Sequence, residues 1–569
     1  MRKEFVVISF VGLLLAGIAT ASLYDHPNYI SNHGDVNRGL IYNAIAKRDI
    51  LSGHLPAWNQ YVCGGMPLIG DLESWFLHPI FFLTIPFSEV LAMKIAYTLV
   101  LLSSFIGFYV FARIILKFKI AGAVLFAIIL AFSGYVSAHL AEGYYVWVAS
   151  AYVPWFLLFA MLALKNLKFI PLAGLMLAFM FGAGSMHLAV YSMLFMGIMY
   201  AFPIVKNKFF RRVAIWMAMG IFFIILSAAK LLPALSLLTA ISSREGFAPA
   251  LTMLPEILFG RGLLGPVISA GQTIRWGEFD AYIGVVAGVL TLFGAFMLRK
   301  KIWQEYRSFL VASIVMAIIA FLPLPITHGF ISHIFDLFRM PSRVLLFSVF
   351  GIALVAGYTI DTISSSRIKI GIKSLIIFVI TLDLVSNDAT LFSRTFTVPL
   401  PEMHTETTFR RVSHAYTSGD EAYYRAVYID YLENRGTNDV CRFYQMGPYS
   451  RAIDETDPRY ISRGEVYADD ANAGTISYSM NARSEYSIHA NIQSATRVII
   501  NQNYYPGWTA SSGGAVENYH GVIAIPVAVG IHDITLRYNP NTVYWGVVIS
   551  LIGCLVGGML WWPKKRQLN

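Results

Sequence analysis

The chain contains a series of apolar segments, each close to the length of a helix that crosses a lipid bilayer. A transmembrane helix needs about 20 consecutive, mainly apolar residues. About twelve segments approach or reach that length, at 5–23, 90–116, 120–138, 144–164, 169–181, 186–204, 214–232, 282–298, 309–324, 344–360, 370–385 and 543–562. The composition, 56% hydrophobic and 13% charged, is also far from that of soluble proteins. The sequence therefore predicts an α-helical polytopic membrane protein with about twelve transmembrane helices.

The basic residues lie in short clusters between these segments. The net charge of +10 would suit a nucleic-acid-binding protein, but no single region carries it, so we expect no nucleic-acid partner. The clusters lie at 117–119, 165–168, 206–212, 299–307, 367–373 and 564–566. All of them fall on one side, and the positive-inside rule assigns that side to the cytoplasm. We expect a multi-pass protein of the cytoplasmic membrane with both termini cytoplasmic; Lys47 and Arg48 are a small exception in the first outer loop.

The first apolar segment has two interpretations. The Ala-Thr-Ala-Ser sequence near its end resembles a signal-peptide cleavage site, but the apolar run exceeds the about 7–15 residues that are usual for a signal peptide. The length favours a retained anchor.

The apolar segments divide the chain into three parts. Residues 1–386 form a transmembrane module with a long first outer loop at 24–89 and a second at 233–280. Residues 387–542 form an extracytoplasmic domain, in which alternating residues at 486–492, 497–501 and 531–538 predict antiparallel strands and a β-sandwich. Residues 543–569 supply the last helix and a basic tail.

Some segments have no single assignment. Residues 402–463 show no clear periodicity. The apolar runs at 76–87 and 326–335 are too short to span a membrane. They are expected to be interfacial or re-entrant pieces that shape a cavity for a lipid-borne substrate, or pieces that merely cap the bundle.

The polar, turn-rich stretch at 33–79 carries the first candidate for chemistry. Asp35 follows Gly34 and precedes residues with helical spacing, so it occupies the position of a helix N-cap carboxylate. A carboxylate near the outer end of a membrane helix, facing an apolar recess, is also suited to general-base catalysis. Both roles remain open for Asp35 on position alone.

Other acidic residues are candidates for a second role. Asp71 and Glu73 would share one face of an extended segment, where both could meet a metal or a basic phosphate clamp; solvated loop acids are the ordinary alternative. Glu142 lies in a very short hairpin beside the bilayer, so its carboxylate should turn toward protein or water. His187 lies near the outer start of its apolar segment, where it would face the same cavity as a candidate for binding the acceptor or sugar, or form a hydrogen bond in the core.

Arginine residues near predicted helix ends on the outer side are candidates for binding a lipid-linked phosphate, because Arg is a bidentate partner of phosphate. These residues are Arg244, Arg275, Arg339 and Arg343. Any single one could instead reach toward lipid head groups. Arg339 and Arg343 are the strongest pair, because Pro341 stiffens the turn between them.

The three cysteines, Cys63, Cys441 and Cys554, indicate neither a disulfide framework nor a metal cluster. One bridge between Cys63 and Cys441 stays open if both face an oxidising compartment. Walker, Rossmann, His-Glu-x-x-His and nucleophile-elbow motifs are absent from the sequence, which argues against an ATP-driven pump. We predict no cofactor and no metal site; a divalent metal is not indicated.

Several motifs, in consistent order along the chain, resemble the bacterial YfhO-type membrane proteins. They lie at Pro56–Asn59, Gly64–Pro67, Pro79, Arg339–Arg343, Tyr505–Trp508, Pro526, Gly530–His532 and Tyr538–Pro540. That family is similar to the GT-C class of membrane glycosyltransferases, which use a polyprenyl-phosphate sugar and an acidic residue of the first outer loop. The resemblance implies a GT-C-like fold and an inverting transfer to an envelope glycopolymer or glycolipid, with Asp35 as the general base.

The resemblance also suggests residues that could contact sugar or acceptor. Trp58 and Asn59 belong to the first-loop motif, and Trp508 belongs to the Pro-Gly-Trp motif of the outer domain. An aromatic residue at a strand end more often serves packing.

Two other functions remain as alternatives. A transporter or flippase of lipid-linked saccharides would be expected to show inverted repeats and broken helices, and no convincing repeat is present. A non-catalytic envelope-assembly scaffold would use the outer domain to bind a protein.

Overall fold

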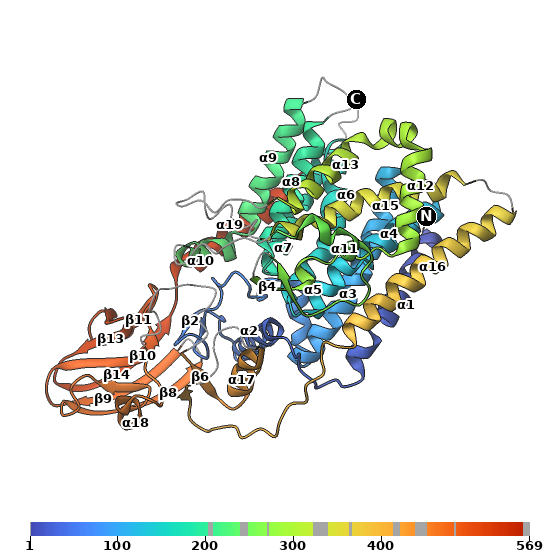
Figure 1. The fold of residues 1–569 in the computed structure, drawn as a ribbon. Coiled ribbons are helices and arrows are strands. Elements are labelled where there is room, and N and C mark those ends of the chain that lie inside the picture. Colours follow the sequence, from blue (N-terminus) through green and yellow to red (C-terminus); the bar gives the residue numbers. More distant parts are fainter. Residues whose placement is uncertain are drawn as a thin grey trace, which may run out of the picture.

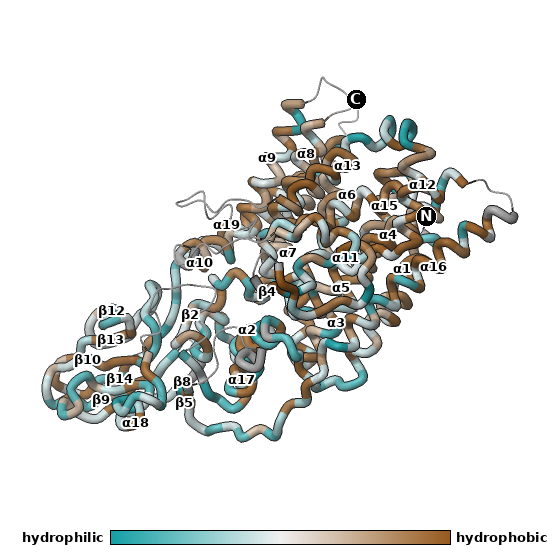
Figure 2. Tube along the Cα trace, viewed as in Figure 1, coloured by the Kyte–Doolittle hydropathy of each residue, from teal (hydrophilic) through white to brown (hydrophobic). Residues whose placement is uncertain are grey.

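The computed structural model joins a helical bundle to a smaller strand-rich domain (Figure 1). It describes residues 2–202, 209–238, 248–269, 272–322, 340–363, 367–413, 421–438, 452–482 and 485–561. Figure 2 shows that hydrophobic residues dominate the bundle, whereas hydrophilic and hydrophobic residues are mixed along the strand-rich domain. We call the end of the bundle that faces the strand-rich domain the sandwich side.

Helices occupy all twelve predicted apolar segments. Within the described ranges, nine helices are long and apolar enough to cross a membrane: Lys3–Tyr24, Glu89–Leu116, Ile120–Ala141, Tyr145–Ala163, Phe209–Leu226, Arg299–Ala320, Pro341–Thr362, Ile370–Phe392 and Asn541–Trp561. Three shorter apolar helices, Leu167–Gly182, Met186–Ala201 and Val285–Met297, coincide with the remaining predicted segments. The chain is therefore a multi-pass membrane protein, as the apolar pattern predicts.

The helices pack mainly as neighbours in sequence, with several long-range contacts. The bounds of the helices used below are α1 Arg2–Thr20, α2 Gly34–Leu51, α3 Glu89–Phe111, α4 Ile120–Ala131, α5 Gly134–Ala141, α7 Ile170–Gly182, α9 Phe209–Leu226, α10 Ala228–Leu238, α15 Leu345–Thr362, α16 Arg367–Phe392, α17 Glu421–Leu432 and α19 Asn541–Trp561. Helix α1 packs against α3 and α16, and α15 packs against α4. On the side away from the sandwich, the carboxylate of Asp361 accepts hydrogen bonds from the backbone N–H groups of Lys119 and Gly122 at the start of α4.

The structure divides one predicted transmembrane segment into two helices. The apolar run at 214–232 is divided into α9 and α10, with the break after Leu226. Helix α10 contains Pro233 and packs against the last helix, α19. Apolar composition alone does not reveal this break, because both helices are apolar on the faces that they bury.

The strand-rich domain is a sandwich of two four-stranded antiparallel sheets, ordered β12-β13-β10-β7 and β11-β14-β9-β8. Its strands are β7 Val466–Ala468, β8 Gly474–Ala482, β9 Glu485–Ile492, β10 Thr496–Asn503, β11 Trp508–Ala510, β12 Glu517–Tyr519, β13 Val522–Val527 and β14 Gly530–Tyr538. Alternate residues of β9, β10, β13 and β14 point inward and form a shared core. The predicted strands and the β-sandwich before the last helix are confirmed.

The long loop between α1 and α3 is folded and connects the two parts of the molecule. It contains α2, the two-stranded hairpin of β1 (Trp58–Asn59) and β2 (Met66–Pro67), and the 3₁₀-helix η2 (Pro79–Thr84). Helix α2 packs beside α17, at the junction of bundle and sandwich (Figure 1). The unassigned stretch 402–463 contains α17, the short helix α18 (Pro458–Arg463) and the parallel pair of β5 (Arg410–Val412) and β6 (Arg435–Thr437).

The two short apolar runs have different outcomes. The run at 76–87 contains only the short, non-spanning η2, and it exposes Phe82 in η2 and Phe87 after it. The run at 326–335 lies outside the described residues.

Candidate functional site

Asp35 lies in the first turn of α2, on the sandwich side of the bundle. It is the second residue of the helix and not its N-cap, which is His33; the N-cap assignment is therefore wrong. A carboxylate in the first turn is still favoured by the helix dipole. The Asp35 side chain is 29% exposed, and its Oδ1 lies 4.0 Å from Nη2 of Arg38. Asp35 thus remains accessible to a ligand while its nearest positive charge is buried.

Arg38 connects Asp35 to the turn that carries the second acidic pair. Its guanidinium forms an ion pair with Glu73. Asp71 Oδ1 accepts a hydrogen bond of 2.7 Å from the Glu73 backbone N–H, and Asp71 Oδ2 accepts one of 3.0 Å from the Tyr42 hydroxyl. Asp71 and Glu73 are therefore in a turn and have different partners. The expected extended segment, with both acids on one face, is wrong because Asp71 closes an Asx turn over Glu73.

Lys230, on α10, holds the same turn from the opposite direction. Its Nζ donates to the carbonyl oxygens of Leu72 and Ser74 at 2.8 and 2.7 Å, and to those of Phe181 and Gly182 at 3.2 Å. The side chain is almost completely buried. A buried ammonium group needs such partners, so Lys230 fixes the turn against the end of α7.

A second charged group surrounds Glu142. The buried carboxylate accepts hydrogen bonds from Arg275 Nη1 at 3.1 Å and from the Gly265 backbone N–H at 2.5 Å. Arg275 Nη1 also lies 3.3 Å from Nδ1 of His33. Burial, and next the positive charge of Arg275, lowers the pKa of His33 to about 4. The structure thus joins Arg275 and Glu142, two predicted site residues, beside the start of α2.

A third charged group is formed by Arg343 and Glu278. Arg343 donates from Nε at 2.7 Å and from Nη2 at 2.5 Å to the two oxygens of the buried Glu278 carboxylate. His139 Nε2 lies 3.9 Å from the same carboxylate, and the His139 ring packs on Trp147 at 4.1 Å. The Tyr144 hydroxyl is close enough to Asp35, Glu142, Glu278 and Arg343 for their charges to act on it. Each of the three charged groups therefore has a member near Tyr144.

Asp280 is a further buried acid near this region. Its oxygens accept hydrogen bonds from the Trp276 indole N–H at 2.8 Å and from the Tyr282 backbone N–H at 2.9 Å. Burial raises the pKa of Asp280 to about 7. These bonds fix the loop that carries Arg275 and Glu278.

Sequence reasoning did not identify several of these residues as parts of the site: Arg38, His33, Glu278, Asp280 and Lys230. The available signal was weak. Arg38 lies three positions after Asp35, which is the spacing of a helical ion pair. Lys230 is a charge near the end of an apolar segment, where a partner inside the protein is expected.

The aromatic sugar-binding candidates are buried in the sandwich. Trp58 is fully buried and lies 5.0 Å from the Trp508 ring and 4.8 Å from the Tyr538 ring. Its Nε1 donates to Gln502 at 3.1 Å. Asn59 is also buried, and its side chain accepts from the Tyr61 backbone N–H. Sugar contact by Trp58, Asn59 and Trp508 is therefore wrong for this structure, because these side chains form core and turn contacts.

The other predicted site residues and the cysteines are only partly covered by the described residues. His187 is half-buried beside Trp147, with its Nε2 3.2 Å from the Ser185 hydroxyl. Arg244 and Arg339 lie outside the described residues. Cys63 is disulfide-bonded and Cys554 is free, while Cys441 lies outside the described ranges. Among the residues that the structure describes, no group of three or more His, Cys, Asp or Glu side chains could hold a metal ion.

Comparison with known proteins gives only distant structural similarity. No protein-family model and no curated protein matches the chain. The arabinofuranosyltransferase AftD from mycobacteria superimposes with a TM-score of 0.41 and 15% identity, over 68% of this chain and 26% of AftD. One class of an AftD mutant superimposes with a TM-score of 0.45 and 15% identity, over 95% of this chain and 42% of AftD. A second class of the same mutant gives a TM-score of 0.40 and 14% identity, over 68% of this chain and 28% of AftD. The chain thus spans less than half of AftD, and similarity at this level assigns no activity.

Proposed function

We propose that this protein is a membrane glycosyltransferase of the GT-C type, which transfers a sugar from a polyprenyl-phosphate donor to a glycopolymer or glycolipid of the cell envelope. One observation carries the proposal. A partly exposed carboxylate, Asp35, stands on the sandwich side of the bundle within one region with two arginines, Arg275 and Arg343, that buried carboxylates hold. This is the combination that a transfer from a lipid phosphate to a hydroxyl requires.

The reaction is an inverting displacement. The Asp35 carboxylate takes the proton of the acceptor hydroxyl as that oxygen attacks the anomeric carbon of the donor sugar. The bond between the anomeric carbon and the phosphate oxygen breaks, and the electron pair leaves with the polyprenyl phosphate. Arg275 and Arg343 stabilise the charge that develops on that phosphate.

The ion pairs of Arg275 and Arg343 orient the two guanidinium groups toward the phosphate that they stabilise. Bonding of Arg343 to both oxygens of Glu278 fixes the plane of the guanidinium before the substrate binds. Pre-oriented donors lose little further freedom when the phosphate arrives, which is the basis of electrostatic preorganisation. Arg275, 30% exposed, is fixed by Glu142 in the same way.

The proposed orientation places the site on the extracytoplasmic face of the cytoplasmic membrane. The basic clusters between apolar segments support it through the positive-inside rule. The disulfide at Cys63, in the first loop, suits an oxidising compartment. The donor lipid would enter from the bilayer, and the acceptor would approach from the sandwich side.

The test uses purified protein, a panel of polyprenyl-phosphate sugars and an assay for released polyprenyl phosphate. Replacement of the general base, Asp35→Asn, should reduce transfer about 10²- to 10⁴-fold. Asp25→Asn is the matched control, because Asp25 is an exposed acid in the same loop.

The outcomes are distinguishable. Full activity of Asp35→Asn would show that Asp35 is not the base. If wild-type protein in vesicles moves the lipid-linked sugar across the membrane without releasing polyprenyl phosphate, the protein is a transporter.

A further inference from the structure

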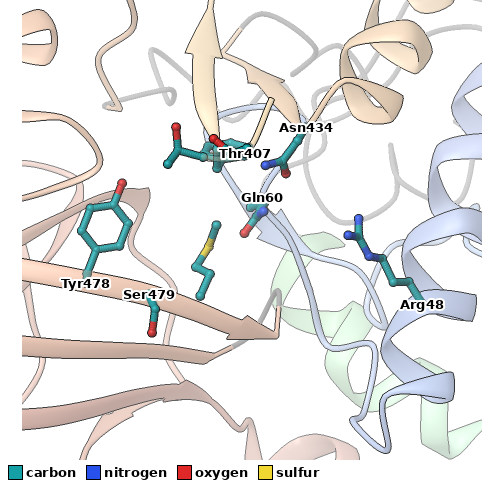
Figure 3. A pocket seen from close by; sticks show the side chains of 9 residues that line it. Arg48, Gln60, Thr407, Asn434, Tyr478 and Ser479 are labelled. Carbon is teal, nitrogen blue, oxygen red and sulfur yellow. The ribbon is translucent and has the colours of Figure 1, made fainter. Parts of the chain in front are cut away.

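A polar pocket lies away from the Asp35 region, at the junction of α2, the first loop and the sandwich (Figure 3). Its volume is about 480 Å³, within the range of small-molecule sites. Its lining combines polar and apolar side chains, and these are Arg48, Gln60, Thr407, Thr408, Phe409, Asn434, Tyr478, Ser479 and Met480. Five separate parts of the chain contribute: the end of α2, the first loop, residues 407–409 before β5, Asn434 before β6, and strand β8.

Gln60 provides independent evidence that the pocket binds a ligand. Its side chain is 1% exposed, and its Oε1 has no hydrogen-bond partner among the described residues. Figure 3 shows the Gln60 amide among the residues that line the pocket. A buried carbonyl oxygen without a partner costs about 1–3 kcal/mol. A ligand that donates a hydrogen bond at this position would remove that cost.

The pocket continues onto the outer face of a sheet. A shallow depression of about 450 Å³ shares Tyr478 and Ser479 with it. The strand registers place polar side chains there in two rows across β8, β9 and β14: Ser479, Ser487 and Thr535 form one row, and Ser477, His489 and Asp533 form the other. In the second row, His489 Nδ1 lies 2.7 Å from the Asp533 carboxylate. Tyr478 and Ser479 point to opposite sides of the edge strand β8 (Figure 3), so the pocket and these rows meet across that strand; together we call them the hydroxyl track.

The chemistry of the lining identifies the class of ligand. Hydroxyl and amide groups both donate and accept hydrogen bonds, as the hydroxyl groups of a sugar require. Phe409 and Tyr478 add aromatic surface for the apolar faces of sugar rings. Arg48 is exposed and forms no ion pair with any described residue, so it can bind a carboxylate or phosphate group.

We infer that the hydroxyl track binds a linear glycan that carries acidic groups, with one acidic sugar in the pocket at Arg48 and Gln60. A peptide added to the free edge of β8 is less suitable. Such a peptide would bind through backbone groups and apolar side-chain pockets, whereas the track offers side-chain hydroxyls on the face of the sheet.

The site is separate from the region around Asp35. Arg48 and Asp35 lie on the same helix, thirteen residues apart, which corresponds to about 20 Å along the axis. Binding in the track therefore does not depend on transfer at Asp35. In combination with the proposed function, the track would hold a distant part of a polymeric acceptor.

The test measures binding by the full chain in nanodiscs, using calorimetry. The probes are an oligogalacturonate, a neutral maltohexaose and a peptide of similar length. The oligogalacturonate should bind, and Arg48→Gln should weaken it about tenfold by removing a charged hydrogen bond. Ser479→Phe, at an exposed position on β8, should weaken binding by placing a ring in the row that Ser479 forms with Ser487 and Thr535.

Matched controls exclude general effects on folding and charge. Arg459→Gln removes an exposed arginine on α18, and Ser494→Phe adds a ring in an exposed turn; both should bind like wild type. The inference would be overturned if the oligogalacturonate did not bind. It would also be overturned if Arg48→Gln and Ser479→Phe bound it as tightly as wild type does. Binding of the peptide alone would overturn it in favour of strand addition. Since the measurement is binding, a failure of the proposed transfer reaction would leave its result unchanged.

Discussion

The Nη2 atom of Arg38 lies 4.0 Å from the Oδ1 atom of Asp35, one turn earlier on the same helix. The same guanidinium is paired with Glu73 in the turn at 71–74. Through Arg38, the position of Asp35, the proposed base, therefore depends on a turn some 35 residues away in sequence. Lys230 of α10 in turn binds the carbonyl oxygens of that turn.

Arg38 and Glu73 should behave as an energetically coupled pair. Arg38→Gln leaves the half-buried Glu73 carboxylate without its charge partner, and should lower the free energy of unfolding by about 1–3 kcal/mol. The double variant Arg38→Gln/Glu73→Gln should be more stable than the sum of the single effects predicts, by about 1 kcal/mol. Thermal unfolding of the purified variants measures this. Simple additivity would show that the pair is not coupled.

His33 should make the protein sensitive to acid. Its pKa of about 4 in the folded state lies below the ordinary value of 6.5, so the unfolded state binds more protons between these values. The contribution of His33 to the free energy of unfolding is complete above about pH 6.5 and is lost as the pH falls toward 4, to a total of about 3 kcal/mol.

The variant His33→Asn should therefore lose less stability than wild type between pH 6.5 and 4, as followed by thermal unfolding at each pH. His404→Asn, at an exposed position, is the control and should follow wild type. Identical pH profiles of wild type and His33→Asn would refute a buried neutral His33.

Lys230→Met should loosen the turn at 71–74. The substitution removes hydrogen bonds to four carbonyl oxygens, so we expect a loss of about 2–4 kcal/mol and faster hydrogen exchange in a peptide that covers the turn. Lys94→Met is a matched control, because Lys94 is also buried and donates to two carbonyl oxygens, those of His26 and Pro27. It should destabilise the protein without changing exchange at 71–74; similar exchange there in both variants would argue against a specific role of Lys230.

The proposed orientation can be tested with a membrane-impermeant maleimide on intact cells. In a Cys554→Ala background, Ser494→Cys on the sandwich should be labelled from outside, and Lys117→Cys on the opposite side of the bundle should be labelled only after lysis. Both positions are exposed, so accessibility to the reagent depends on the side of the membrane. Labelling of Lys117→Cys in intact cells would reverse the orientation.

The membrane part of the fold could be read from the sequence because a bilayer imposes length and composition on every helix. The strands of the sandwich were also readable, since one face of each is buried and the residues alternate, as at Tyr486 and Ile488.

The candidate site was only partly predictable. Arg275 and Glu142 were identified separately, but their pairing links positions 133 residues apart, and no local pattern encodes such a contact. The spacing of Asp71 and Glu73 predicts a shared face only for an extended segment, whereas the Asx turn directs them to different partners. Trp58 was assigned to ligand binding because it lies in a conspicuous motif; its burial depends on a domain that lies more than 400 residues later in sequence.

The position of Trp58 has a consequence for the order in which the protein is assembled. The hydrogen bond from Trp58 to Gln502 joins residues 444 positions apart. At synthesis rates of about 5–20 residues per second, the first loop must wait roughly 20–90 s for the strands that enclose this tryptophan. Until then its indole ring is exposed, and the hairpin that follows α2 has no core to pack against. The hairpin of the first loop therefore reaches its final form among the last parts of the molecule, and a chain that is released early would present an unfinished loop for quality control to recognise.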